Sequence, residues 1–284
     1  MNSVDMVYKS DEGMCIVREV VSDIYSNFTE YEYEGFRIDS EAGETYIMRF
    51  GDEQKPPLVM LHGSTSNNAA WFGSLSFFIN DFCIYLIDVP GEPGLSEAKR
   101  IKLASKIPAA WFLEVLDALK IEKAAFVTMS LGSWFGLNFA VNYPDRVKAM
   151  SLITTSGIEP AKVSFILKAL FCMMLGKPGQ KMLNKAIYYK VPLEMTVEQL
   201  RFQEVAAKHF KPLTEAVPIF TDDQLKQINF PLQYFGGDHD VLLNSEATGK
   251  RIKEMVPSAE VNILAETGHV ILGVFDKIAD FLKE

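Results

Sequence analysis

Ser130, which lies between two apolar residues of this 284-residue sequence, is the leading candidate for a reactive side chain. Ser130 follows the apolar run Ala124–Val127, and Gly132 comes two residues later. Beyond the glycine, Trp134–Tyr143 carries apolar residues at helical spacing. A strand, a tight turn and a helix in this order push a hydroxyl out of the edge of a sheet into a cleft. The pattern predicts that Ser130 is a nucleophile, although Thr128 stands where such turns usually have glycine.

A serine nucleophile needs a base to take its proton, and the base needs an acid to orient it. Of the four histidines, His269 is the one that follows both the serine and the candidate acids, after the last predicted strand. His62 precedes a glycine at a strand end, which favours a structural hydrogen bond. His209 has lysine neighbours on a predicted helix, and His239 lies in a polar turn. The order Ser, Asp, His therefore predicts His269 as the base.

Two aspartates at the end of one predicted strand are the candidate acids. We prefer Asp240, because a turn at Gly237 comes before it and the apolar pair Val241-Leu242 follows it. Asp238 is the alternative, and Glu159 is a more remote third candidate.

Attack on an acyl carbon produces a negative oxygen, which backbone N–H groups must stabilise. The predicted donors are the N–H of Leu131, directly after Ser130, and that of Ser64, directly after His62-Gly63. Loss of one such donor typically lowers the rate by about 10²- to 10³-fold.

Continuous apolar runs indicate the strands that position these residues. Such runs are typical of parallel strands covered on both faces, and they occur at 58–61, 83–87 and 124–127. Further strands are expected at 149–154 and 231–235. Predicted helices alternate with them, at 71–79, 106–119, 134–143, 245–255 and 271–282. This rhythm predicts an α/β fold with a mostly parallel, doubly wound sheet, whose carboxyl-end edge collects the chemistry. Before it, a helix at 14–28 and a hairpin of strands at 31–38 and 45–50 are expected.

The alternation of predicted strands and helices stops between Gly157 and Asn229, where the pattern favours helices without a strand. Capping boxes open two of them, at Thr196–Gln199 and Thr221–Gln224. Val163–Leu175 is nearly all apolar and is too short to span a bilayer, so it is expected to pack on the core or to line an apolar pocket. We therefore expect a core of residues 1–156 and 230–284 and a helical cap of residues 157–229.

Composition restricts the possible partners. The net charge of −9 and the pI of about 5.1 favour a neutral or apolar ligand over nucleic acid or an anionic membrane. Neither a leader peptide nor a spanning segment is expected, which predicts a cytoplasmic protein. The cysteines Cys15, Cys83 and Cys172 are widely spaced in apolar contexts, which predicts buried inert thiols, with no disulfide framework and no metal set.

The sequence resembles the α/β-hydrolase fold superfamily from about Tyr31 onward. The resemblance is carried by LVMLHGS (58–64), IYLIDVPGEPGLS (84–96), VTMSLGSWFGLNFAVNYPDRV (127–147), FGGDHDVL (235–242) and ETGHVI (266–271). The DxPGxxxxS and PDRV stretches are similar to those of its peroxidase- and esterase-like branch. The resemblance implies the nucleophile Ser130, the acid Asp240, the base His269, the oxyanion donors Ser64 and Leu131, and a helical cap.

The expected activity is hydrolysis of apolar carboxylic esters through an acyl-Ser130 intermediate, without a cofactor or metal. A carbon–carbon bond hydrolase, a perhydrolase and an aminopeptidase are open alternatives, because they share the triad. Gly132-Ser133-Trp134 is similar to the GxSWG motif of proline iminopeptidases, a register that would make Ser133 the nucleophile. A non-catalytic ligand receptor of the same fold is a further alternative.

Overall fold

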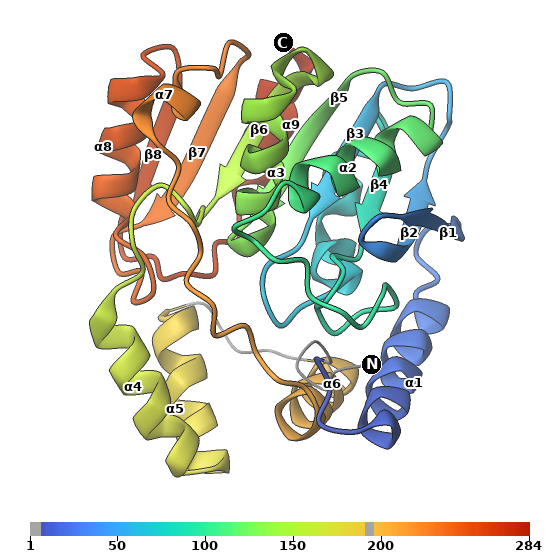
Figure 1. The fold of residues 1–284 in the computed structure, drawn as a ribbon, viewed down its shortest axis with the longest axis vertical. Helices are drawn as coiled ribbons and strands as arrows, with labels where there is room; N and C mark the ends of the chain where they lie inside the picture. The colour runs from blue at the N-terminus through green and yellow to red at the C-terminus, as the bar shows by residue number, and fades with distance from the viewer. Residues whose placement is uncertain (1–6, 191–195) are drawn as a thin grey trace.

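The structure, a computed structural model, describes residues 7–190 and 196–284 and is organised around one eight-stranded sheet (Figure 1). The strand order is β1-β2-β4-β3-β5-β6-β7-β8. The first two ladders, β1 with β2 and β2 with β4, are antiparallel, and all the others are parallel. The strands are β1 (Tyr33–Ser40), β2 (Gly43–Phe50), β3 (Pro57–Leu61), β4 (Cys83–Ile87), β5 (Ala124–Met129), β6 (Val147–Ile153), β7 (Leu232–Gly237) and β8 (Glu260–Leu264). The predicted mostly parallel α/β sheet is confirmed.

Each central strand supplies two hydrophobic cores, because successive side chains point to opposite faces. In β3, Val59 and Leu61 belong to one buried cluster, and Leu58 and Met60 belong to the other. The first cluster includes residues of α2 (Ile107–Ala118), α3 (Leu131–Asn142) and α8 (Ser245–Met255). The second includes residues of α1 (Asp11–Asn27), η1 (Asn68–Phe77) and α9 (Phe275–Lys283). Burial on both faces explains why most positions in these strands are apolar.

Two predicted helices differ from the structure. The segment predicted as a helix at 71–79 is the 3-10 helix η1, which begins at Asn68, where the Asn67 side chain accepts a hydrogen bond from the Ala69 N–H. The helix predicted at 271–282 begins only at Phe275. Gly273 has a φ of +76°, a left-handed conformation that a right-handed helix does not contain.

The described residues between β6 and β7 form four helices. They are α4 (Val163–Met174), α5 (Lys177–Tyr188), α6 (Val197–His209) and α7 (Asp222–Leu225). Both predicted capping boxes are confirmed, at the starts of α6 and α7. Helices α4 and α5 pack on each other, whereas α6 packs on α1. The boundaries of the core at 1–156 and 230–284 and of the cap at 157–229 stay a prediction.

The apolar segment Val163–Leu175 differs from the expectation that it packs on the core or lines a pocket. Among its described side chains, those of Val163, Phe171 and Met174 are more than half exposed. In residues 7–190 and 196–284, no helix is both long enough and apolar enough to cross a membrane.

The cysteines are as expected at two positions out of three. Cys83 and Cys172 are buried, but Cys15 is exposed, because it lies on the outward face of α1. Within the described ranges, no group of three or more His, Cys, Asp or Glu residues is arranged to hold a metal ion.

Candidate active site

Ser130 occupies the sharp turn between β5 and α3. Its φ of 51° and ψ of −114° lie outside the regions that L-residues with a side chain favour, so the backbone here is strained. The neighbouring strand holds the turn, because the Ser130 N–H donates to the carbonyl of Ile153 over 2.9 Å. The predicted strand, turn and helix are present, with the serine at the apex.

Glycines let the loop after β3 approach this turn. A Cβ at Gly132 would overlap the carbonyl oxygens of Leu61 and His62, so no other residue fits there without a shift. A Cβ at Gly63 would lie 3.9 Å from the Ser130 Oγ, which places the His62-Gly63 loop beside the hydroxyl.

Thr128 fits before the serine because Gly136 lies opposite it on α3. A Cβ at Gly136 would come within 3.0 Å of the Thr128 Cγ2, so the missing side chain there makes room for the threonine methyl group. The Thr128 hydroxyl is buried and is 3.1 Å from the Ser133 Oγ, with which it forms a hydrogen bond. The glycine that sequence reasoning looked for before Ser130 is thus replaced by one on the facing helix. The same contact places Ser133 inside the helix packing, away from the apex.

A chain of hydrogen bonds joins three of the predicted site residues. The Ser130 Oγ lies 3.1 Å from the Nε2 of His269, and the His269 Nδ1 lies 2.8 Å from the Oδ2 of Asp240. Asp240 is 1% exposed and His269 is 9% exposed, so water has little access to the bond between them. The loops after β5, β7 and β8 supply these residues, and the parallel register brings them to one edge of the sheet. This arrangement can transfer a proton from the serine to the imidazole.

The loop after β7 holds the Asp240 carboxylate in place. Its Oδ1 accepts hydrogen bonds from the backbone N–H groups of Leu242, at 2.7 Å, and Leu243, at 3.0 Å. Burial by itself would raise the pKa of Asp240, but the hydrogen bond and charge of His269, together with the two N–H groups, hold the pKa below its ordinary value. Asp240 is therefore an anion near neutral pH.

The alternative acid, Asp238, faces a different histidine. Its Oδ1 lies 2.8 Å from the His239 Nδ1 and accepts a hydrogen bond from the Thr267 N–H. The His239 hydrogen bond lowers the pKa of Asp238 to about 2, with a further contribution from the Thr267 N–H. The third candidate, Glu159, precedes α4 and has no hydrogen bond to His269 among those the structure describes.

His62 has the structural role that the sequence predicts. The Val89 N–H donates to its Nε2 over 3.0 Å, so the ring proton must be on Nδ1, which lies 2.9 Å from the Gly63 carbonyl. Burial lowers the pKa of His62, although Asp88 and the Gly63 carbonyl act in the opposite direction. The neutral ring thus fixes the loop that leads to Ser64.

The second predicted oxyanion donor, Leu131, is the first residue of α3. The first N–H groups of a helix have no acceptor within the helix and are free to bind an anion. The N–H groups of Leu131 and Ser64 therefore remain the candidates for this task.

Sequence reasoning missed Glu92, which is buried beside the oxyanion loop. The side chain is 4% exposed, and its Oε2 accepts a hydrogen bond from the Thr65 N–H over 2.5 Å. Burial raises the pKa of Glu92 from 4.5 to about 7, although Thr65, Arg100 and Ser64 act in the opposite direction. The one signal in the sequence was a lone glutamate inside the glycine- and proline-rich stretch Gly91–Ser96.

We expect Glu92→Gln to remove a pH-dependent loss of stability. Since the folded-state pKa of Glu92 is raised from 4.5 to about 7, its favourable contribution is complete below pH 4.5 and is lost as the pH rises through 7. Between about pH 5 and pH 8 this loss amounts to about 2 to 3 kcal/mol in the free energy of unfolding. Denaturant unfolding at both pH values should show the loss in the wild type and not in the variant. The matched control is Glu122→Gln, at an exposed glutamate; equal pH dependence of wild type and Glu92→Gln would contradict the expectation.

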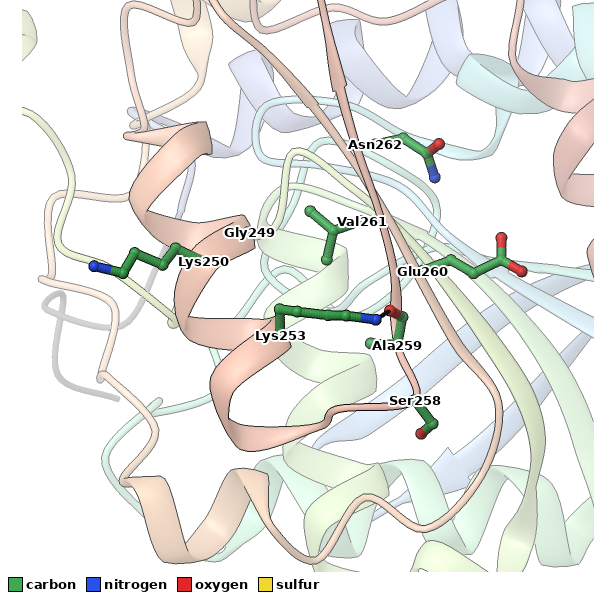
Figure 2. Close-up of a pocket in the computed structure, with 8 residues that line it drawn as sticks. All are labelled: Gly249, Lys250, Lys253, Ser258, Ala259, Glu260, Val261 and Asn262. Atoms are coloured by element: carbon green, nitrogen blue, oxygen red, sulfur yellow. Dashed lines mark hydrogen bonds between the residues drawn. The ribbon is translucent and has the colours of Figure 1, made fainter.

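A hollow elsewhere on the surface takes no part in this site. It has a volume of about 570 Å³ and lies between α8 and β8 (Figure 2), lined by Gly249, Lys250, Lys253 and Ser258–Asn262. Its residues come from the end of α8 and the beginning of β8, whereas Asp240 and His269 follow the ends of β7 and β8. The hollow is therefore at the opposite end of the sheet.

The fold and this arrangement define a class of protein. The model of the alpha/beta hydrolase fold family matches residues 56–170, a range that contains the turn at Ser130. Naproxen esterase (carboxylesterase NP) from Bacillus subtilis has a solved structure with a TM-score of 0.83, at 22% identity, over 96% of each chain. The chain therefore has the α/β-hydrolase fold.

Two proteins that are similar in sequence to this chain have names that state an activity. Carboxylesterase YbfK of Bacillus subtilis is 26% identical over 249 residues, which are 84% of this chain and 83% of that protein. A 2-hydroxy-6-oxononadienedioate/2-hydroxy-6-oxononatrienedioate hydrolase of Paraburkholderia phymatum is 27% identical, over 76% of this chain and 81% of that protein.

Proposed function

We propose that this protein is a serine hydrolase that cleaves carboxylic esters of apolar substrates through an acyl-Ser130 intermediate. The observation that carries the proposal is the unbroken hydrogen-bond chain from the Ser130 Oγ through His269 to Asp240. The names of the Bacillus carboxylesterase relatives support the ester class.

The reaction follows from the geometry of the chain. Ser130 attacks the acyl carbon while His269 takes the hydroxyl proton at Nε2. Asp240 accepts the Nδ1–H bond, which holds the ring and stabilises the positive charge that forms on it. The N–H groups of Ser64 and Leu131 bind the oxyanion. His269 then gives the proton to the leaving alcohol, and a water activated by the same imidazole releases the carboxylic acid and regenerates the serine.

Carbon–carbon bond hydrolysis is a second candidate function. It is favoured by the relative from Paraburkholderia phymatum, which is named for the hydrolysis of 2-hydroxy-6-oxononadienedioate and 2-hydroxy-6-oxononatrienedioate. The same three residues would serve, because the bond that breaks is again next to a carbonyl carbon. A dianionic substrate is less suited to this chain, since its net charge is −9.

A panel of substrates tests both candidates with one enzyme preparation. We expect 4-nitrophenyl esters from acetate to decanoate to be hydrolysed, with kcat/KM rising from acetate to a medium-chain acyl group. We expect a 2-hydroxy-6-oxo-dienoate, followed by the loss of its absorbance, to be turned over at least 100-fold more slowly. The proposal fails if no ester is hydrolysed faster than in buffer, and the second candidate replaces it if the dienoate is the faster substrate.

A further inference from the structure

Positive charge gathers in one short stretch of this acidic protein. Residues 160–193 contain six lysines and no aspartate or glutamate, although the net charge of the whole chain is −9. The six are Lys162, Lys168, Lys177, Lys181, Lys185 and Lys190. The stretch includes α4 and α5, which pack on each other to form a helical hairpin, Val163–Tyr188. The net charge of the chain therefore does not describe this part of its surface.

The same hairpin exposes large apolar side chains. The exposed fractions are 58% for Phe171, 86% for Met174 and 48% for Met182. Val163 and Leu175 are also exposed, and so are the lysines Lys168, Lys181 and Lys185. Several large apolar side chains exposed on one pair of helices indicate an interaction surface, and lysines interspersed among apolar side chains are typical of helices that lie at a lipid surface.

The hairpin projects from the body of the protein, and its base is bonded to the candidate site. Figure 1 shows α4 and α5 extending away from the sheet, below β7 and β8. Before α4, the Lys162 Nζ donates to the Asp240 carbonyl over 2.6 Å. Near the end of α5, the Ile187 carbonyl accepts the His269 N–H over 3.0 Å. The base of the hairpin is thus connected directly to the loops of the acid and the base.

We propose that the α4–α5 hairpin docks on anionic lipid surfaces and brings the candidate active site to esters dissolved in the lipid. The second half of this statement rests on the proposed ester hydrolysis. Phe171, Met174 and Met182 enter the boundary between head groups and acyl chains, and the exposed lysines Lys168, Lys181 and Lys185 pair with anionic head groups. The acidic remainder of the protein is repelled by the same surface, so the hairpin is the part that faces it.

Charge argues for lipid over two other occupants. A second copy of this hairpin would bring two sets of four lysines together, which like-charge repulsion disfavours. A nucleic acid would satisfy the lysines, but its backbone offers no apolar phase to receive Phe171 and Met174. An anionic bilayer accepts both kinds of side chain.

Co-sedimentation of the full-length protein with vesicles tests the docking without reference to catalysis. We expect at least ten-fold stronger binding to phosphatidylcholine vesicles that contain 30% phosphatidylglycerol than to pure phosphatidylcholine. The double variants Lys181→Glu/Lys185→Glu and Phe171→Ser/Met174→Ser should each weaken this binding at least ten-fold. The matched controls lie outside the hairpin at exposed positions, Lys226→Glu/Lys250→Glu and Leu272→Ser, and should bind like the wild type.

Three outcomes would overturn the docking proposal. They are equal binding to both vesicle types, full binding by the hairpin variants, and a dimer in sedimentation velocity that only the hairpin variants lose. Ser130→Ala should bind the vesicles like the wild type, because docking does not need the nucleophile. This variant therefore tests docking independently of the proposed function. Turnover of a water-soluble acetate ester by the hairpin variants should match that of the wild type. If neither the wild type nor any variant hydrolyses an ester but vesicle binding persists, the proposed ester hydrolysis is wrong and the docking proposal stands.

Discussion

Ser130→Ala should lower kcat for the best ester of the panel by about 10⁴- to 10⁶-fold, the range seen when a serine nucleophile is removed. The reason is that no other hydroxyl in the described structure lies at the strained turn with His269 at hydrogen-bond distance. Labelling of the protein by a fluorophosphonate probe should disappear with the activity. Circular dichroism and thermal unfolding should show a folded variant, because alanine removes no buried contact beyond the His269 hydrogen bond.

Ser133→Ala is the matched control for this variant. Ser133 is three residues away, is completely buried and forms its hydrogen bond with Thr128, so it should keep both the labelling and the esterase activity. Undiminished turnover by Ser130→Ala would refute the proposed nucleophile. Loss of labelling in Ser133→Ala alone would support the alternative register Gly132-Ser133-Trp134.

Asp240→Asn should lower kcat by about 10⁴-fold while leaving the fold intact. The asparagine can present its amide NH₂ to the His269 Nδ1, which favours the ring tautomer that carries its proton on Nε2 and prevents Nε2 from accepting the Ser130 proton. The contact that would be altered is the 2.8 Å bond between the Asp240 Oδ2 and the His269 Nδ1. Steady-state kinetics on the same ester, with the KM determined separately, measures the effect.

Asp238→Asn provides the comparison, because the two aspartates are two residues apart in one loop. Asp238 bonds to His239 and to the Thr267 N–H, and it has no described hydrogen bond to His269, so its replacement should leave kcat close to that of the wild type. A large loss in Asp238→Asn with little change in Asp240→Asn would exchange the two assignments.

The sheet was predictable because strands that are buried on both faces have continuous apolar sequences. Runs such as Leu58–Leu61 and Cys83–Ile87 have no polar position, and both are strands of the parallel part of the sheet. The helices were less regular, since the start of α9 depends on the backbone conformation of Gly273, and η1 departs from α-helical hydrogen bonding. Neither property changes the apolar pattern from which helices are predicted.

The three residues of the candidate triad were predictable because each follows a strand and they occur in the order serine, aspartate, histidine. The structure brings Ser130, Asp240 and His269 together, and their catalytic role stays a prediction until the variants are measured. What the sequence did not reveal were interactions between distant segments. The raised pKa of Glu92 comes from its burial among distant segments, and Thr128 is accommodated because Gly136 faces it from the next helix.

The exposure of the apolar hairpin was missed for a related reason. An apolar segment such as Val163–Leu175 normally packs on the core, and its sequence contains no sign of which neighbours will cover it. Helix α4 packs on α5, and the side chains of Phe171 and Met174 stay exposed to solvent.

The conformation of Ser130 bears on whether the chain is an enzyme or a receptor of the same fold. A non-glycine residue held at a φ of 51° and a ψ of −114° costs about 1 to 3 kcal/mol, out of a total folding stability of about 5 to 15 kcal/mol. Glycine would avoid most of that cost at this position. If Ser130 is the nucleophile, as we propose, the reactivity of its hydroxyl is the reason that this cost in stability is tolerated.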